Sequence, residues 1–135
     1  MKSVAERTEK YRKNALRILL LRKAMIEAEI DWLNIKQSLN LSQYELNKLK
    51  NGELEEREAE VWGMIDGTPA SIKSRDKTFK EFQKALLDRG LSLKEFCEMA
   101  EINVNKAYRV IRGEAVTKDV AAEKKIEETL GVKLF

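Results

Sequence analysis

Hydrophobic residues recur every three to four positions along most of the chain, which is the spacing of one face of an α-helix. Residues 4–28 predict one long amphipathic helix, with a hydrophobic stripe of Val4, Tyr11, Ala15, Ile18, Leu19, Met25 and Ile26. Residues 76–89 predict another, with a stripe of Phe79, Phe82, Ala85 and Leu86. These patterns predict an all-α protein.

The segment 90–113 predicts two short helices joined by a tight turn. Ser92 and Glu95 have the spacing of a capping box, in which each side chain binds the backbone N–H of the other residue. Asn103 is a suitable N-cap for the second helix, and Gly113 is suited to end it. The segment therefore predicts a helix, a turn and a second helix over 103–112.

The second of these helices has two different faces. Its apolar face consists of Ala107, Val110 and Ile111. The other face has no acidic residue and carries Asn105, Lys106, Tyr108, Arg109 and Arg112. A short helix with amides and cations on its outer face, set against another helix, is what the major groove of DNA accepts.

The segment resembles the helix-turn-helix of the lambda-repressor-like (Cro/XRE-type) DNA-binding family, most clearly within residues 76–131. The matching positions follow the family pattern in order and without a gap: Gly90-Leu91-Ser92, Phe96-Cys97, Ile102-Asn103, Ala107, Val110 and Gly113. Two positions depart from it, because Glu101 stands where the turn usually has Gly and Leu93 where Gln is frequent. Glu101 must therefore be helical or adopt a left-handed backbone.

The resemblance implies which side chains contact DNA. Base contacts fall on Val104, Asn105 and Arg109: Asn can pair with adenine, Arg with guanine, and Val can only touch a thymine methyl group. The expected phosphate contacts are Lys94, Asn103, Lys106 and Arg112. Asn103 serves either the phosphate or the helix cap. We expect Tyr108 to pack half-buried and not to contact bases.

Residues 30–66 resemble a weaker copy of the same motif. A shift of 61 positions places Leu41 on Ile102, Leu46 on Ala107 and Gly52 on Gly113. Ser42 and Glu45 form a second capping box. The chain is therefore expected to contain two helix-turn-helix units in tandem. Further candidate DNA contacts in the first unit are Gln43, Tyr44 and Lys48.

The two copies differ in charge. Residues 27–68 contain four basic and ten acidic residues, a net charge of −6, whereas residues 69–135 have a net charge of +3. Five of the acids lie within 53–60, directly after Gly52. Carboxylates in this region would repel phosphates. We therefore expect the first unit to contact a protein partner through segment 53–60, or to pack on the second unit.

The loop-forming residues 67–71 predict the domain boundary. We expect a first helical unit over 1–67, a linker over 68–75 and the DNA-binding domain over 76–135. Thr117 is expected to cap a last helix over about 118–130, whose buried residues are expected to be Val120, Ala121, Ile126 and Leu130.

The composition argues against several classes of site. The chain has no His and one Cys, so zinc fingers, disulfide frameworks and His-based catalysis are excluded, and Cys97 is expected to be a core residue. No Gly-rich phosphate loop or nucleophile elbow occurs, so we expect no enzyme, catalytic residue, metal or cofactor. The apolar run 18–21 is too short to span a membrane. A cytoplasmic protein, associated with the nucleoid when bound to DNA, is expected.

The sequence thus favours a sequence-specific regulator of transcription that binds double-stranded DNA, of the repressor-like bacterial or phage type. It would act either as a homodimer or as an intramolecular pseudo-dimer of its two units. The alternative is a protein-interaction module, such as an antirepressor or adaptor, that binds another regulator and not DNA. Only the DNA-binding protein should lose affinity steeply as salt rises.

Overall fold

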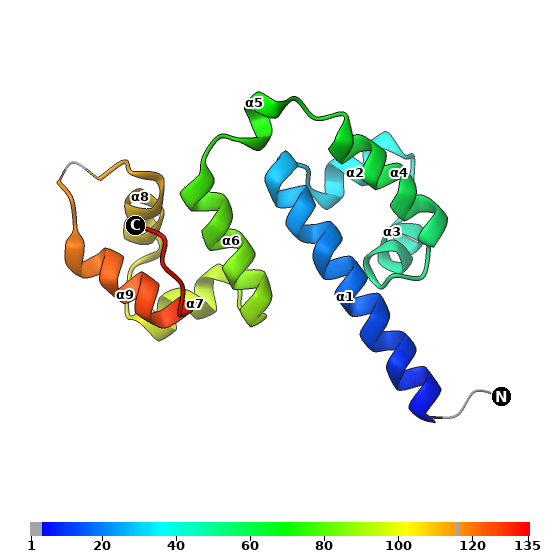
Figure 1. Ribbon diagram of the computed structural model, residues 1–135, viewed down its shortest axis with the longest axis horizontal. Helices are drawn as coiled ribbons and strands as arrows, with labels where there is room; N and C mark the ends of the chain where they lie inside the picture. The colour runs from blue at the N-terminus through cyan, green and yellow to red at the C-terminus, as the bar shows by residue number, and fades with distance from the viewer. Residues whose placement is uncertain (1–3, 116) are drawn as a thin grey trace. The chain divides into compact units, whose positions relative to one another are not determined.

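The computed structural model describes residues 4–115 and 117–135, and all the regular structure in these residues is α-helical (Figure 1). The all-α prediction is therefore confirmed. The helices are α1 (Val4–Ala28), α2 (Trp32–Ser38), α3 (Gln43–Lys50), α4 (Glu55–Asp66), α5 (Ala70–Lys73), α6 (Lys77–Arg89), α7 (Leu93–Ala100), α8 (Val104–Arg112) and α9 (Val120–Leu130).

The chain divides into two compact units, with the boundary between Ser74 and Arg75. The first unit contains α1 to α5, and the second contains α6 to α9. The short helix α5 lies within the stretch 68–75 that the sequence suggests as a linker, and it packs against α1. The assignment of domains to 1–67 and 76–135 stays a prediction.

The core of the first unit is formed by the second half of α1 together with α2, α3 and α4. Ile35, Leu49 and Val61 are fully buried in it, and Ile18 and Met25 of the predicted α1 stripe are buried as well. The first half of α1 extends beyond α2, α3 and α4 (Figure 1), so Val4 and Tyr11 of the same stripe are exposed. The hydrophobic stripe of α1 therefore extends beyond the part of the helix that packs against α2, α3 and α4.

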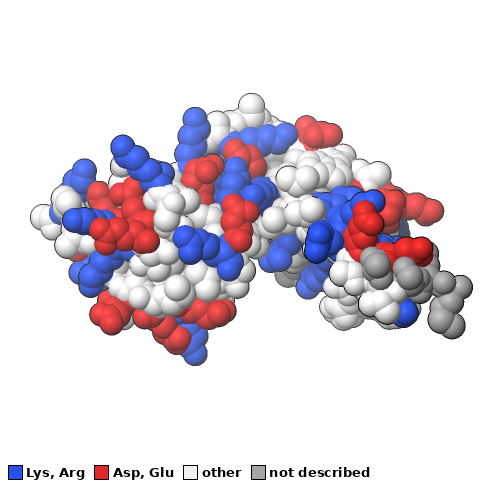
Figure 2. All heavy atoms as spheres, turned by 60° about the horizontal axis from the view of Figure 1, so that its bottom comes forward, with Lys and Arg blue, Asp and Glu red and all other residues white. Residues whose placement is uncertain are grey.

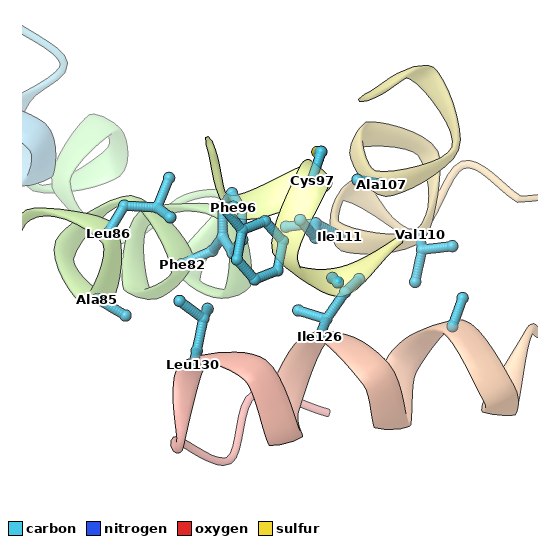
Figure 3. Close-up of a cluster of buried hydrophobic side chains, with 12 residues drawn as sticks. Phe82, Ala85, Leu86, Phe96, Cys97, Ala107, Val110, Ile111, Ile126 and Leu130 are labelled. Carbon is cyan, nitrogen blue, oxygen red and sulfur yellow. The ribbon is translucent and has the colours of Figure 1, made fainter. Parts of the chain in front are cut away.

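The core of the second unit lies between α6, α7, α8 and α9. The rings of Phe82 and Phe96 meet edge to face at its centre, with centroids 5.1 Å apart. Ile126 and Leu130 close it from α9, and Ile111 points into it from α8 (Figure 3). Cys97 is buried here, as predicted, and burial raises the pKa of its thiol. This core fixes the position of α8.

The predicted caps at the starts of the short helices are confirmed. The backbone N–H of Glu95 donates to the Ser92 hydroxyl at 3.1 Å, and the Ser92 N–H donates to the Glu95 carboxylate at 3.2 Å. Ser42 and Glu45 form the same pair of bonds before α3. These reciprocal bonds satisfy N–H groups that the first helical turn leaves free.

The start of the last helix differs from the prediction. Asp119, and not Thr117, caps α9, because its carboxylate accepts a bond from the Ala122 N–H at 3.0 Å. The helix begins at Val120, which is 64% exposed, and Ala121 is exposed too. The predicted burial of Ile126 and Leu130 is confirmed, and Ala122 is buried in place of Val120 and Ala121, so the buried residues follow one another at the helical spacing of four.

The backbone repeats itself after 61 residues. Left-handed residues occur at Glu29, Asn40 and Gly52 in the first unit, and at Gly90, Glu101 and Gly113 in the second. Each of them follows the end of a helix, and the N–H of the next residue bonds back across the last turn. Thus the Leu41 N–H donates to the Lys36 carbonyl at 2.9 Å, and the Ile102 N–H donates to the Cys97 carbonyl at 3.0 Å.

The hydrophobic cores repeat in the same register. Buried residues 61 positions apart include the pairs Leu21 and Phe82, Met25 and Leu86, Ile35 and Phe96, Leu49 and Val110, Val61 and Ala122, and Ile65 and Ile126. The repeat therefore begins within α1, ahead of the segment 30–66 in which the sequence shows it. The use of either helix pair to bind DNA remains a prediction.

Candidate nucleic-acid interface

The helix α8 is held by its apolar face and presents its polar face to solvent. Ala107, Val110 and Ile111 are buried in the core of the second unit. Gly113 ends the helix with a left-handed backbone, at a φ of 71°. The outward face contains Asn105, Lys106, Tyr108, Arg109 and Arg112, none of which is buried. The predicted division of this helix into two faces is thus confirmed.

Two of the three predicted base contacts are available to a ligand. Asn105 and Arg109 are exposed, and within the described residues neither side chain has a hydrogen-bond or ion-pair partner. Val104 is only half-buried, and it packs against the core of the second unit. Its side chain therefore stabilises the start of α8 as well as bordering the polar face.

Asn103 is engaged in capping. The Asn105 N–H donates to the Asn103 side-chain oxygen at 2.9 Å, which fixes the first turn of α8. The sequence left open whether this side chain caps the helix or contacts phosphate. The oxygen is used by the cap, and the exposed amide nitrogen retains its donors.

Lys106 lies on the exposed side of α8 and forms an ion pair across to the start of α9. Its ammonium lies 3.1 Å from the Asp119 carboxylate. The pKa of Asp119 is lowered, first by the hydrogen bond from the Ala122 N–H and then by Lys106. A phosphate contact by Lys106 would thus have to compete with Asp119.

Arg112 rests on two aromatic rings. Its guanidinium carbon lies 4.3 Å from the centroid of Phe79 and 5.8 Å from that of Tyr108. The two rings are 5.8 Å apart, and Tyr108 is 36% exposed, in accord with the expected half-buried packing. Cations are attracted to the faces of aromatic rings, so this stack fixes the direction of Arg112. The sequence offered no signal for it, because Phe79 belongs to α6.

The remaining predicted phosphate contact, Lys94, is exposed on the first turn of α7. A cavity of about 610 Å³ lies beside α8, between this helix and the residues that lead to α9. Its lining mixes both signs of charge and includes Lys106, Arg109, Glu114, Lys118 and Asp119. On the face shown in Figure 2, basic and acidic side chains are likewise interspersed. Attraction to an anion must therefore arise locally, on the acid-free face of α8.

The candidate residues of the first unit lie on one face of α3. Tyr44 is 68% exposed, and the Lys48 ammonium lies 4.8 Å from the centre of its ring. Interaction with the Tyr44 hydroxyl raises the pKa of Lys48, which therefore stays charged. Gln43 accepts a bond from the Lys36 ammonium at 3.1 Å and donates one to Asn47 at 3.0 Å.

The acidic segment 53–60 is partly neutralised by two arginines. Glu58 is only 4% exposed, and Arg17 binds it with two hydrogen bonds, of 2.6 and 3.0 Å. Arg17 also lies 3.7 Å from Glu55, and Arg57 lies 2.6 Å from Glu60. The sequence argument set the five carboxylates against Arg57 alone and did not include Arg17. The pairing was not visible there, because Arg17 comes from α1.

The Arg17 side chain also binds the end of α3. It donates to the Gly52 carbonyl at 2.8 Å and to the Asn14 side-chain oxygen at 3.0 Å. Gly52 has a φ of 76°, and a Cβ atom there would lie 2.9 Å from the Asn14 Cβ. The cluster thus joins α1, α4 and the turn after α3.

A relative is found for part of the chain. A stretch of 42 residues is 45% identical to part of an uncharacterized HTH-type transcriptional regulator of Methanocaldococcus jannaschii, where HTH stands for helix-turn-helix. The aligned stretch covers 31% of this chain and 24% of the relative, so the likeness spans about a quarter of the relative's length. No family model and no solved structure matches the chain. The likeness supports a helix-turn-helix family for part of the chain.

Every helix in the described part of the chain is too short or too polar to cross a lipid bilayer.

Proposed function

We propose that the chain is a transcriptional regulator that binds double-stranded DNA and places α8 in the major groove. The observation that carries the proposal is the outer face of α8, where Asn105 and Arg109 are exposed and, within the described residues, unpaired. The similarity to a helix-turn-helix regulator supports the same function.

The chemistry of the face fits the edges of base pairs. An asparagine amide can bind N6 and N7 of adenine, and an arginine guanidinium can bind O6 and N7 of guanine. Both side chains lie one turn apart on the same side of α8, which a helix in the groove requires. Val104 adds apolar surface at the start of the helix, where a thymine methyl group would be met.

Phosphate contacts would position the helix in the groove. Arg112 is directed by its aromatic stack, and Lys94 is exposed at the start of the neighbouring helix α7. Lys106 and the amide nitrogen of Asn103 border the same face. Each cation that replaces a counterion on the DNA adds to the affinity and to its salt dependence.

The proposal includes a repressor-like regulator of the bacterial or phage type that acts in the cytoplasm at the nucleoid. The protein would recognise paired half-sites as a homodimer or through its two units. It would have no enzymatic activity. The DNA-binding domain would be 76–135, joined by 68–75 to a first domain over 1–67.

One observation favours a different function for the chain. On α1, the side chains of Val4, Tyr11, Leu16 and Leu20 are exposed. Leu16 and Leu20 lie one helical turn apart and form an apolar strip that is suited to bind another protein. Under this alternative the chain is an antirepressor or adaptor that binds another regulator and does not bind DNA.

The test is the anisotropy of fluorescent random-sequence duplex DNA, titrated with the full chain at several salt concentrations. We expect binding that weakens steeply as salt rises. Replacing Arg109 and Arg112 together with Ala should lower the affinity about tenfold or more and reduce the salt slope by about 0.9, the contribution of the phosphate contact of Arg112. The matched control is Lys124→Ala, which removes an exposed cation of α9 that is paired with Glu128.

Absence of binding by the unmodified chain at low salt would contradict the proposal and favour the adaptor. Equal loss in the Lys124→Ala control would show that only net charge matters, which contradicts a role for α8. Circular dichroism of each variant checks that the helices are intact.

A further inference from the structure

The helix α3 occupies the same place in the first unit as α8 does in the second. Both follow a left-handed turn residue and a capping residue, and both end at a left-handed glycine. The offset of 61 places Gln43 on Val104, Tyr44 on Asn105 and Lys48 on Arg109. The three candidates of α3, of which Gln43 and Tyr44 are exposed and Lys48 is half-buried, thus coincide with the three candidate base contacts of α8.

The outer face of α3 is also ordered by its own contacts. Lys36 of α2 holds the Gln43 amide, which in turn holds Asn47 one helical turn further on. Lys48 is fixed beside the Tyr44 ring. Fixed amides and cations lose less conformational entropy when they bind, which favours recognition of a rigid partner.

The charge argument against this face is weakened in the structure by two arginines that pair with the acidic segment. Of the acids in 53–60, Glu58 is buried against Arg17, Glu60 is paired with Arg57 and Glu55 lies near Arg17. Glu53 and Glu56 are the members of the segment without an ion pair among the described residues. Paired charges exert a weak field at a distance, so a phosphate near α3 would meet a net charge of −3 from the five carboxylates and the two arginines, and not −5.

We propose that the first unit is a second binding surface for double-stranded DNA, and that α3 contacts the duplex through Gln43, Tyr44 and Lys48. This inference rests on the proposed function, since the repeat carries the role of α8 onto α3. The Gln43 amide has the groups to bind adenine, Lys48 can bind guanine or a phosphate, and Tyr44 offers a ring and a hydroxyl to the backbone. One chain would then contact DNA twice.

The experiment uses the full chain and the same duplex titration. Tyr44→Ala with Lys48→Ala should lower the affinity about fivefold or more and reduce the salt slope by about 0.9, the contribution of one cation. The control is Lys13→Ala, which removes an exposed cation of α1 that is paired with Glu9. Two further variants of the full chain are compared with these. One carries Arg109→Ala with Arg112→Ala, and the other carries all four substitutions, at Tyr44, Lys48, Arg109 and Arg112.

Reduced affinity in both double variants, with a larger loss when they are combined and none in the control, supports two surfaces. A Tyr44/Lys48 variant that binds as well as the unmodified chain overturns the inference while leaving the proposed function intact. If the Tyr44/Lys48 variant lost affinity for DNA and the Arg109/Arg112 variant did not, the result would support a role for α3 and contradict the role of α8. An equal loss in the Lys13→Ala control also overturns the inference, because it would trace the effect to net charge.

Discussion

Asn40 and Glu101 stand 61 residues apart and have nearly the same left-handed backbone, with φ values of 51° and 54°. Each lies in the turn between two short helices of its own unit. Left-handed residues other than Gly are uncommon, and Asn is among the side chains that tolerate the conformation best. Both turns therefore carry the same left-handed backbone strain, at Asn40 in one unit and at Glu101 in the other.

Glu101→Gly should raise the stability of the second unit, because glycine adopts this backbone without steric cost. The strain removed is about 1 kcal/mol, and part of it is offset by the larger entropy of glycine in the unfolded chain. The measurement is the free energy of unfolding in urea. Asn40→Gly should gain less, and Glu98→Gly, inside α7, should lose about 1 kcal/mol. A loss of stability in Glu101→Gly would show that its side chain makes a contact worth more than the strain.

Glu58→Ala should destabilise the first unit strongly. The substitution leaves the Arg17 guanidinium without its bidentate partner in a half-buried site, and breaking such pairs costs about 2 to 4 kcal/mol. The matched variant is Glu60→Ala, which removes a more exposed carboxylate from the same helix. It should cost less than about 1 kcal/mol. Equal effects of the two substitutions in thermal unfolding would contradict the structural role of the Arg17 cluster.

The stability of the second unit should depend on the ionisation of Asp119. Its pKa is lowered in the folded protein, so its contribution is present above the ordinary value of 3.8 and is lost as the pH falls through the lower folded value. Asp119→Asn should therefore reduce the melting temperature at pH 7, and the difference from the unmodified chain should shrink below about pH 4. Calorimetry at a series of pH values measures this. A difference that stays constant down to pH 2 would exclude the charge as its cause.

Phe79→Leu should weaken DNA binding although it removes no charge. The ring beneath Arg112 would be lost, and a cation–ring contact at the surface is worth about 0.5 to 1 kcal/mol, which corresponds to about a two- to fivefold change in affinity. The salt slope should stay the same, since the cation remains. Arg112→Lys provides the complementary variant. Unchanged affinity in Phe79→Leu would mean that the stack does not orient Arg112 toward the DNA.

The sequence predicted the elements whose signals are local. The capping residues Ser42, Ser92 and Asn103 lie within three positions of the N–H groups that they bind, and helical spacing identified the buried face of α8. The start of α9 was predicted wrongly because Asp119 and Thr117 are both suitable N-caps, and the burial of Ala122 decided between them.

Contacts between distant parts of the chain could not be predicted. Arg17 and Glu58 are 41 positions apart, and nothing near either residue indicates the other. The repeat within α1 was also missed, because Glu29 takes the left-handed place that Gly90 has in the second unit. At the candidate site, the type of side chain pointed to Asn105 and Arg109; both are exposed, and their contact with DNA stays a prediction. The pairing of Lys106 with Asp119 and the stacking of Arg112 depend on α9 and α6.

The Arg17 cluster bonds the end of α3 to α1. The end of α3 is bonded to α1 through the Gly52 carbonyl, and the contact between Gly52 and Asn14 leaves no free space between them. In the second unit the corresponding Gly113 has open space where its side chain would be. A ligand that displaces α3 must therefore carry α1 with it, including the half of that helix that extends beyond α2, α3 and α4. The end of α8 has no such contact at its glycine.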